Sequence, residues 1–217
     1  LDVEALVEGR RHPAGQGGEQ GDPDGNSVER PPYGFPSYRL EAVVPKGPVP
    51  VGFWRSVGHS HTAFFDECFL DEVALAMKKE PLALRRELLK DHPRHLAVLD
   101  AASKAAGWGT PVAAGLGRGI ALRQSFGSIV AQVAEVAVEG NAIRVKRVVC
   151  AVDCGRVVNP AIVRAQIESG IVYGLSAALF GEITIKNGVV EQGNFRDYEV
   201  VRLTDMPVIE TLIVESP

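Results

Sequence analysis

A change of pattern near Pro111 constrains the fold more than any other feature of the sequence. Three stretches before it, residues 64–79, 80–89 and 95–106, have helical apolar spacing or helix-end residues. Three β-branched stretches follow it, at 117–128, 129–140 and 142–155. A long helix is predicted from Pro160, and two or three strands after it. This order excludes a regular βαβ repeat and predicts an α+β fold: a helical layer, then a mixed β-sheet with one long buried helix.

Residue types at element ends and faces refine this prediction. Phe65, Phe69, Val73 and Met77 recur every four residues, so they are predicted to form the core face of the first helix. Gly140-Asn141 and Asn187-Gly188 are turn dipeptides between strands. The sequence also predicts a short strand at 38–44.

The sequence predicts three regions. Residues 1–32 form an N-terminal segment whose part 10–32 is rich in Gly, Pro and polar residues, so a surface insertion is favoured over a binding arm. Residues 33–110 form the helical part, and residues 111–217 form the β-rich part. Because the sequence begins at Leu1 and ends within a strand pattern, we expect it to be a piece of a longer chain, which leaves its compartment open.

Composition narrows the functional classes. Lys plus Arg number 23 against 27 Asp plus Glu, a net charge of −4 without a basic stripe, which argues against a nucleic-acid binder. No apolar run reaches the roughly 20 residues of a membrane span, so an integral membrane protein is not expected. Cys150 and Cys154 lack a second ligand pair at zinc-site spacing, so buried thiols are favoured over metal ligands or a disulfide. For His59 and His61, surface or capping roles are favoured over metal binding or catalysis.

Two polar features point to a ligand site. The segment GFWRSVGHS at 52–60 places two aromatic residues and an arginine between glycines just before a helix, which suits an oxyanion site, although a packing loop is the alternative. Gln166 projects from the helix expected to be buried. Its amide is expected to bond either to neighbouring backbone or to the polar edge of a cofactor.

Several long segments occur in an order that a known family shares: GFWRSVGHS, AFFDECFLDEVA, HPRHLAVLDAASKAAGWG, GRGIALRQSFGSIVAQVAEV, VVCAVDCGRVVNPAIVRAQIESGIVYGLSAALFGEITIKNG and FRDYEVVRL. On these segments the chain from about Tyr33 onward resembles the molybdopterin-binding large subunit of the xanthine dehydrogenase and aldehyde oxidase family. Within it, the branch of isoquinoline 1-oxidoreductase beta subunits is the most similar.

The resemblance implies a molybdenum-dependent oxidoreductase. Its cofactor would be molybdopterin, in bacteria the cytosine dinucleotide form, and the reaction would hydroxylate an aldehyde or N-heteroaromatic substrate with oxygen from water. Electrons would leave through a small partner subunit with two [2Fe-2S] clusters. In such a site the protein positions the cofactor and shapes its electrostatics.

The resemblance also assigns residues. Cofactor contacts are implied for Gln166, for the loop before the first helix and for a second loop at 126–128. Val57 would line the substrate pocket, where xanthine oxidases carry a stacking Phe, so purine recognition is not expected. No residue would bind the metal directly. The implied cofactor-binding set is Phe53, Trp54, Arg55, Ser56, Phe126, Gly127, Ser128 and Gln166.

One departure limits what the resemblance implies. The family's catalytic glutamate lies in a GEPG-like motif that would follow Pro217, so no catalytic residue is assigned. The 217 residues alone are therefore expected to be inactive and to bind the cofactor poorly. A non-catalytic binding or scaffold module that retains the fold is the alternative function. Substrate, electron acceptor and oligomeric state stay open.

Overall fold

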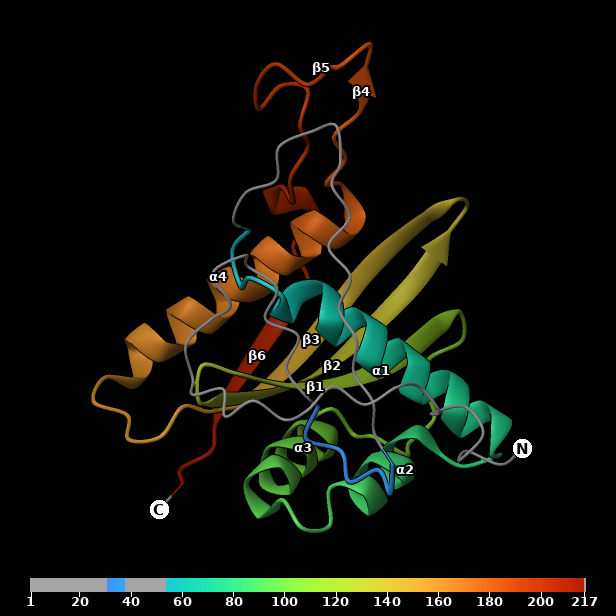
Figure 1. The fold of residues 1–217 in the computed structure, drawn as a ribbon, viewed down its shortest axis with the longest axis vertical. Coiled ribbons are helices and arrows are strands. Elements are labelled where there is room, and N and C mark those ends of the chain that lie inside the picture. The colour runs from blue at the N-terminus through green and yellow to red at the C-terminus, as the bar shows by residue number, and fades with distance from the viewer. Residues whose placement is uncertain (1–30, 38–53, 217) are drawn as a thin grey trace. The chain divides into compact units, whose positions relative to one another are not determined.

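Figure 1 shows the computed structural model, which describes residues 31–37 and 54–216. The predicted strand at 38–44, nearly all of the 10–32 segment and Phe53 lie outside the described residues. The chain divides into two compact units, one comprising residues 1–96 and 123–126 and the other residues 97–122 and 127–217. The boundaries predicted at 32/33 and 110/111 stay predictions.

The first unit is organised by two helices, α1 (His59–Ala76) and α2 (Pro81–Leu88). Glu80 caps α2 by accepting hydrogen bonds from the backbone N–H groups of Leu82 and Ala83, and Pro81 occupies the first turn as predicted. Arg85 of α2 is fully buried and donates to the carboxylates of Glu67 and Asp71 on α1. These ion pairs join the two helices.

The predicted core face of α1 is wrong. Phe65 is 60% exposed and Phe69 is 51% exposed, whereas Leu70 and Ala74 are buried. Glu67 is buried with them because Arg85 and the Tyr33 hydroxyl both donate to its carboxylate. The buried face of α1 therefore includes an ion-paired carboxylate at a position where an apolar residue would be expected.

The second unit is built on a four-stranded sheet of order β1-β2-β3-β6. Its strands are β1 (Leu116–Ser125), β2 (Ser128–Glu139), β3 (Ala142–Asp153) and β6 (Val208–Ile213). β2 and β3 are antiparallel, joined at the predicted Gly140-Asn141 turn, where Gly140 has φ +64°. β6 pairs in parallel with β3, so the sheet is mixed.

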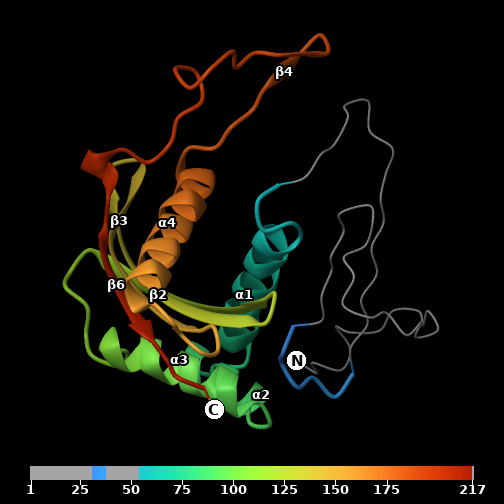
Figure 2. The ribbon, with the colours of Figure 1, turned by 90° about the vertical axis from the view of Figure 1, so that its left-hand side faces the viewer.

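Two helices cover this sheet. Figure 2 shows α4 (Pro160–Leu179) on one face, while residues 97–105 of α3 (Pro93–Ala105) lie on the other. From α4, Ile167, Ile171 and Leu175 pack against Val148 and Cys150 of β3. The α+β class is thus confirmed.

The prediction that the long helix is buried is correct only for the side of α4 that faces the sheet. Ile171 is the one buried residue among those described in α4, and the small residues Gly170, Gly174 and Ala177 are exposed. A Cβ at Gly170 or Gly174 would meet no atom within 4 Å. These small residues therefore lie on the side of the helix that the sheet does not cover.

A short hairpin follows α4. β4 (Ile185–Lys186) and β5 (Val189–Val190) pair on either side of the predicted Asn187-Gly188 turn, and Figure 1 shows them beyond the end of α4. Both turn residues have positive φ, as a two-residue hairpin loop requires. Each of the two strands has only two residues.

Candidate functional site

The loop that precedes α1 is tightly turned. The Val57 N–H donates to the Trp54 carbonyl and the His59 N–H donates to the Ser56 carbonyl. Ser56 has φ +73° and Val57 has φ +50°, a left-handed conformation that is costly for a β-branched residue. Trp54, Arg55 and Ser56 are exposed. Such strain is typical of segments held in shape for binding.

A second turn, at Phe126 and Gly127 between β1 and β2, has the same character. Phe126 has φ +47° and Gly127 has φ +81°. The Phe126 ring is 80% exposed, yet its edge contacts the ring of His59, with centroids 5.3 Å apart. Phe126 therefore lies beside the residue that directly follows the 54–58 loop.

Arg123 fixes this arrangement within the first unit. Its two terminal nitrogens donate to Asp66 Oδ2 and Thr62 Oγ1 of α1, each at 2.7 Å. Burial raises the pKa of Asp66 and the Arg123 guanidinium opposes that rise. The end of β1 is thus held on the first two turns of α1, close to the strained loop.

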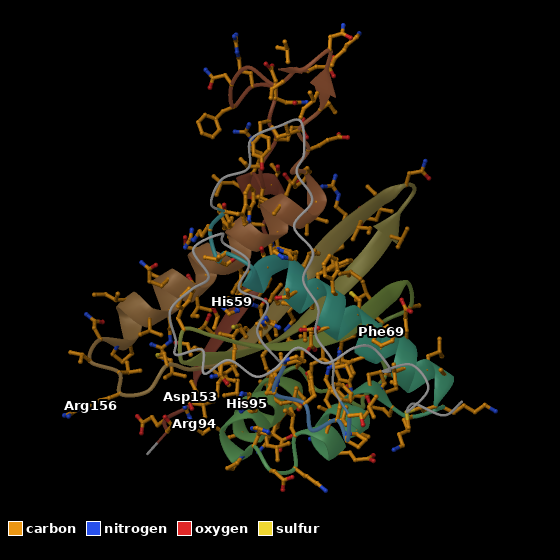
Figure 3. The ribbon with its side chains drawn as sticks, viewed as in Figure 1. His59, Phe69, Arg94, His95, Asp153 and Arg156 are labelled. Atoms are coloured by element: carbon orange, nitrogen blue, oxygen red, sulfur yellow. The ribbon has the colours of Figure 1, made fainter. Side chains whose placement is uncertain are left out.

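The two histidines of this region differ in environment. His59 lies at the start of α1 (Figure 3) and is buried. His61 is exposed and contacts Phe65 edge to face. No group of three or more His, Cys, Asp and Glu side chains suited to a metal ion occurs among the described residues. The burial of His59 differs from the predicted surface or capping role, because Phe126 covers its ring.

Gln166 lies in the second unit on α4. Asn159 caps this helix by accepting from the Ala161 and Ile162 N–H groups, and Pro160 follows in the first turn. Gln166 is exposed, and no described residue hydrogen-bonds to its side chain. The bond to neighbouring backbone that the sequence offered as one alternative is therefore not formed.

Of the two cysteines predicted to be buried thiols, Cys150 is buried and Cys154 is only half-buried. The three cysteines are free thiols, and Cys150 is buried against α4. Burial raises its pKa to about 12. Cys154 is half-buried and pairs with neither of the others.

The structure brings part of the predicted set together. Trp54, Arg55, Ser56 and Phe126 belong to the first unit, whereas Gly127, Ser128 and Gln166 belong to the second. The common cofactor contact of these residues stays a prediction. Sequence reasoning missed Arg123, although a charged residue within an apolar strand is a signal that it has a partner.

Residues 103–207 match the family model of the molybdopterin cofactor-binding domain. These residues form a molybdopterin cofactor-binding domain, and the chain is similar to molybdenum-binding subunits of xanthine dehydrogenases. It is 33% identical to the isoquinoline 1-oxidoreductase subunit beta of Brevundimonas diminuta over 189 residues, which cover 85% of the chain and 24% of the relative.

The chain also matches two other known proteins. The chain is 30% identical to the membrane-bound aldehyde dehydrogenase [pyrroloquinoline-quinone] of Gluconacetobacter polyoxogenes over 186 residues, or 76% of the chain and 24% of the relative. Quinoline 2-oxidoreductase from Pseudomonas putida 86 matches with 28% identity and a TM-score of 0.40 over 42% of this chain and 12% of that one. The chain thus spans about a quarter of the curated relatives' length. No helix in the described part of the chain is long and apolar enough to cross a membrane.

Proposed function

We propose that the protein is part of the large subunit of a molybdenum hydroxylase that oxidises an aldehyde or N-heteroaromatic substrate. The observation that carries this proposal is the match of residues 103–207 to a molybdopterin cofactor-binding domain, in which Gln166 stands exposed on a capped helix. The names of two relatives, an isoquinoline oxidoreductase and an aldehyde dehydrogenase, support the two substrate classes. A scaffold module without catalytic activity is the outcome that the test below has to exclude.

The chemistry of the exposed donors fits the cofactor. The Gln166 amide both donates and accepts, which suits the mixed donor and acceptor edge of a pterin. Arg55 supplies a guanidinium and Ser56 a hydroxyl, which suit anionic and oxo oxygens. The open positions around Gly170 and Gly174 leave room for a group to lie against α4.

Each residue has a proposed task. Gln166 holds the pterin edge, Arg55 and Ser56 contribute polar contacts from the strained loop, and Phe126 provides an aromatic surface. Val57 shapes the substrate side of the pocket. The remaining proposed contacts are Phe53, Trp54, Gly127 and Ser128.

When bound, the cofactor supplies oxidative hydroxylation with oxygen from water. We propose the cytosine dinucleotide form of the cofactor and a small partner subunit with two [2Fe-2S] clusters that accepts the electrons. The chain's own residues orient the cofactor and keep other groups from contacting it.

The proposal is tested by measuring how much cofactor the chain binds. We would express the 217-residue chain in a bacterium that synthesises molybdopterin cytosine dinucleotide, then measure bound molybdenum by mass spectrometry and the CMP released by acid. Because the 217 residues span about a quarter of the relatives' length, we expect weak loading, with both signals still above background in the unmodified chain. Gln166→Ala should lose at least about fivefold, because that change removes the pterin contact. Glu168→Gln, an exposed change on the same helix, serves as the control and should load normally.

The outcomes separate the alternatives. Background molybdenum and CMP in the unmodified chain would overturn cofactor binding and favour the scaffold module. Molybdenum with a released nucleotide other than CMP would overturn only the cytosine dinucleotide form. Equal loading of Gln166→Ala and Glu168→Gln would remove Gln166 from the site.

A further inference from the structure

A cavity of about 410 Å³ in the first unit is lined by none of the residues assigned to the molybdopterin cofactor. One wall is the segment Pro31–Gly34, and the other carries His92, His95, Arg123 and Gln124. This volume is within the range of small-molecule sites, which combine apolar walls with a few placed polar groups. The cavity does not depend on the proposed function.

The Pro31–Gly34 wall is fixed in place by contacts at its end. Tyr33 is buried, and its hydroxyl donates to Glu67 Oε1 at 2.6 Å. The Gly34 N–H donates to the Leu88 carbonyl, and a Cβ at this glycine would come within 3.1 Å of that oxygen. This wall presents two proline rings and the edge of a tyrosine, which suit the apolar body of a ligand.

Arg123 lines the cavity, and one of its hydrogen-bond donors is unused. Its terminal nitrogens are bound to Asp66 and Thr62, but its Nε is buried and has no hydrogen-bond partner among the described residues. Buried donors are nearly always satisfied, so this N–H calls for an acceptor that the described residues do not supply.

The opposite corner has a fixed pattern of donors. His95 Nε2 lies 2.7 Å from Gln124 Oε1, and because an amide oxygen can only accept, the imidazole N–H donates. This bond directs the amide NH2 group of Gln124 away from the His95 ring as a further donor. The His92 ring meets the His95 ring edge to face, with centroids 5.3 Å apart.

The polar side chains that line the cavity offer mainly hydrogen-bond donors. None of the side chains that line it carries a carboxylate. Asp66 and Glu67 are the nearest acidic groups bonded to the lining residues, and each is engaged by an arginine, Arg123 or Arg85. An anionic group in the cavity would therefore find donors without facing a free carboxylate.

We propose that this cavity binds a small organic oxyanion, a carboxylate or a phosphate ester. Arg123 Nε and the Gln124 amide donate to the anionic oxygens, and the imidazoles of His92 and His95 complete the polar side. The Pro31–Gly34 wall contacts the apolar body. Carboxylate and phosphate share this recognition because both present charged oxygens to guanidinium and amide N–H groups.

The test is a titration of the 217-residue chain followed by calorimetry and by the imidazole resonances in NMR spectra. The probes are benzoate and inorganic phosphate, with neutral benzamide as the matched uncharged probe. We expect at least one anion to bind at millimolar concentration or below, to shift the resonances of His92 and His95, and to leave exposed His61 unchanged. Benzamide should bind at least about tenfold more weakly.

Two variants sharpen the test. Gln124→Glu places a carboxylate at the polar corner and should weaken anion binding about tenfold or more. Arg123→Lys keeps a cation for Asp66 but removes the Nε donor, and should weaken binding to a similar extent. Gln192→Glu, the same charge change at a residue that does not line the cavity, should bind like the unmodified chain, and circular dichroism would check that each variant folds.

The result identifies the ligand class. Binding of benzoate alone indicates a carboxylate, and binding of phosphate alone indicates a phosphate ester. The proposal is overturned if neither anion binds at a concentration of about 10 mM, or if benzamide binds as tightly as the anions. It is also overturned if the folded variants Gln124→Glu and Arg123→Lys both bind the anion as tightly as Gln192→Glu.

Discussion

Ser56 and Val57 hold the loop before α1 in a conformation that their side chains disfavour. The sequence predicted that this loop matters, from its aromatic residues, arginine and glycines. It did not predict the left-handed backbone, because the residue types there are not those that favour positive φ. The neighbours of the loop, above all the contact between His59 and Phe126, are set by chain segments distant in sequence.

Val57→Gly tests the strain directly. A left-handed β-branched residue costs about 1–2 kcal/mol, and glycine costs about 0.5–1 kcal/mol in extra unfolded-state entropy. In urea unfolding, we therefore expect Val57→Gly to be as stable as the unmodified chain or more stable by up to about 1.5 kcal/mol. Val138→Gly in β2, where φ is ordinary, should lose about 1 kcal/mol; equal losses in both variants would mean that Val57 carries no strain.

The buried Arg85 supports a second prediction. Its neighbours Glu67 and Asp71 raise the pKa of its guanidinium further above the ordinary value, so it is charged at every accessible pH. Arg85→Ala leaves the Glu67 carboxylate buried without its cation and should cost about 3–5 kcal/mol. Arg86→Ala, at an exposed position of the same helix, should cost less than about 1 kcal/mol by urea unfolding. Similar losses in the two variants would contradict the network's role.

The thiols are predicted to differ in reactivity with pH. Burial holds the pKa of Cys150 at about 12, so its reactive thiolate is nearly absent at pH 8 and forms only as pH approaches that value. We expect iodoacetamide at pH 8 to label exposed Cys68 first, although burial and nearby carboxylates raise its pKa as well, and to label Cys150 only after urea unfolding. Peptide mass spectrometry distinguishes the sites; rapid native labelling of Cys150 would show that the α4–β3 contact opens.

At the scale of elements, the sequence predicted where helices begin more accurately than which side of a helix is buried. Glu80-Pro81 and Asn159-Pro160 marked the starts of α2 and α4, since a capping side chain and a proline act locally. The buried face of α1 was misread because Glu67 is made compatible with burial by Arg85 from another helix. A periodicity argument cannot include a partner from another element.

The cap of α4 gives an element-scale prediction. The Asn159 side chain accepts from two backbone N–H groups at 3.0 and 3.3 Å. Asn159→Ala should lower stability by about 1 kcal/mol and Asn159→Asp should keep most of it, because aspartate also caps. Urea unfolding followed at 222 nm would measure both. An alanine variant as stable as the unmodified chain would show that the cap contributes nothing.

At the scale of the whole molecule, the α+β class and the order of elements were predictable because the apolar period changes along the chain. How far each helix is covered was not, because cover depends on tertiary packing. Large apolar side chains stay exposed in both units, among them Phe64, Phe65, Leu75, Ile162 and Phe195. Their number fits a chain that spans about a quarter of the length of its relatives.

This exposure has a measurable consequence. Contiguous exposed apolar residues favour association, so we expect the 217-residue chain to bind the dye ANS and to self-associate as concentration rises. Phe64→Gln with Phe65→Gln, which removes two neighbouring rings of α1, should reduce both signals. Sedimentation velocity is the measurement. A monodisperse monomer without dye binding would contradict the expectation.

The parallel pairing of β6 with β3 makes assembly of the sheet depend on a segment far downstream of β3. β3 ends at Asp153, and its partner begins only at Val208, after α4 and the hairpin. During synthesis, therefore, one side of β3 keeps its backbone hydrogen-bonding groups unpaired until residues 208–213 have emerged from the ribosome. An interruption of translation before residue 208 would leave an open strand edge, the kind of surface on which chains join one another.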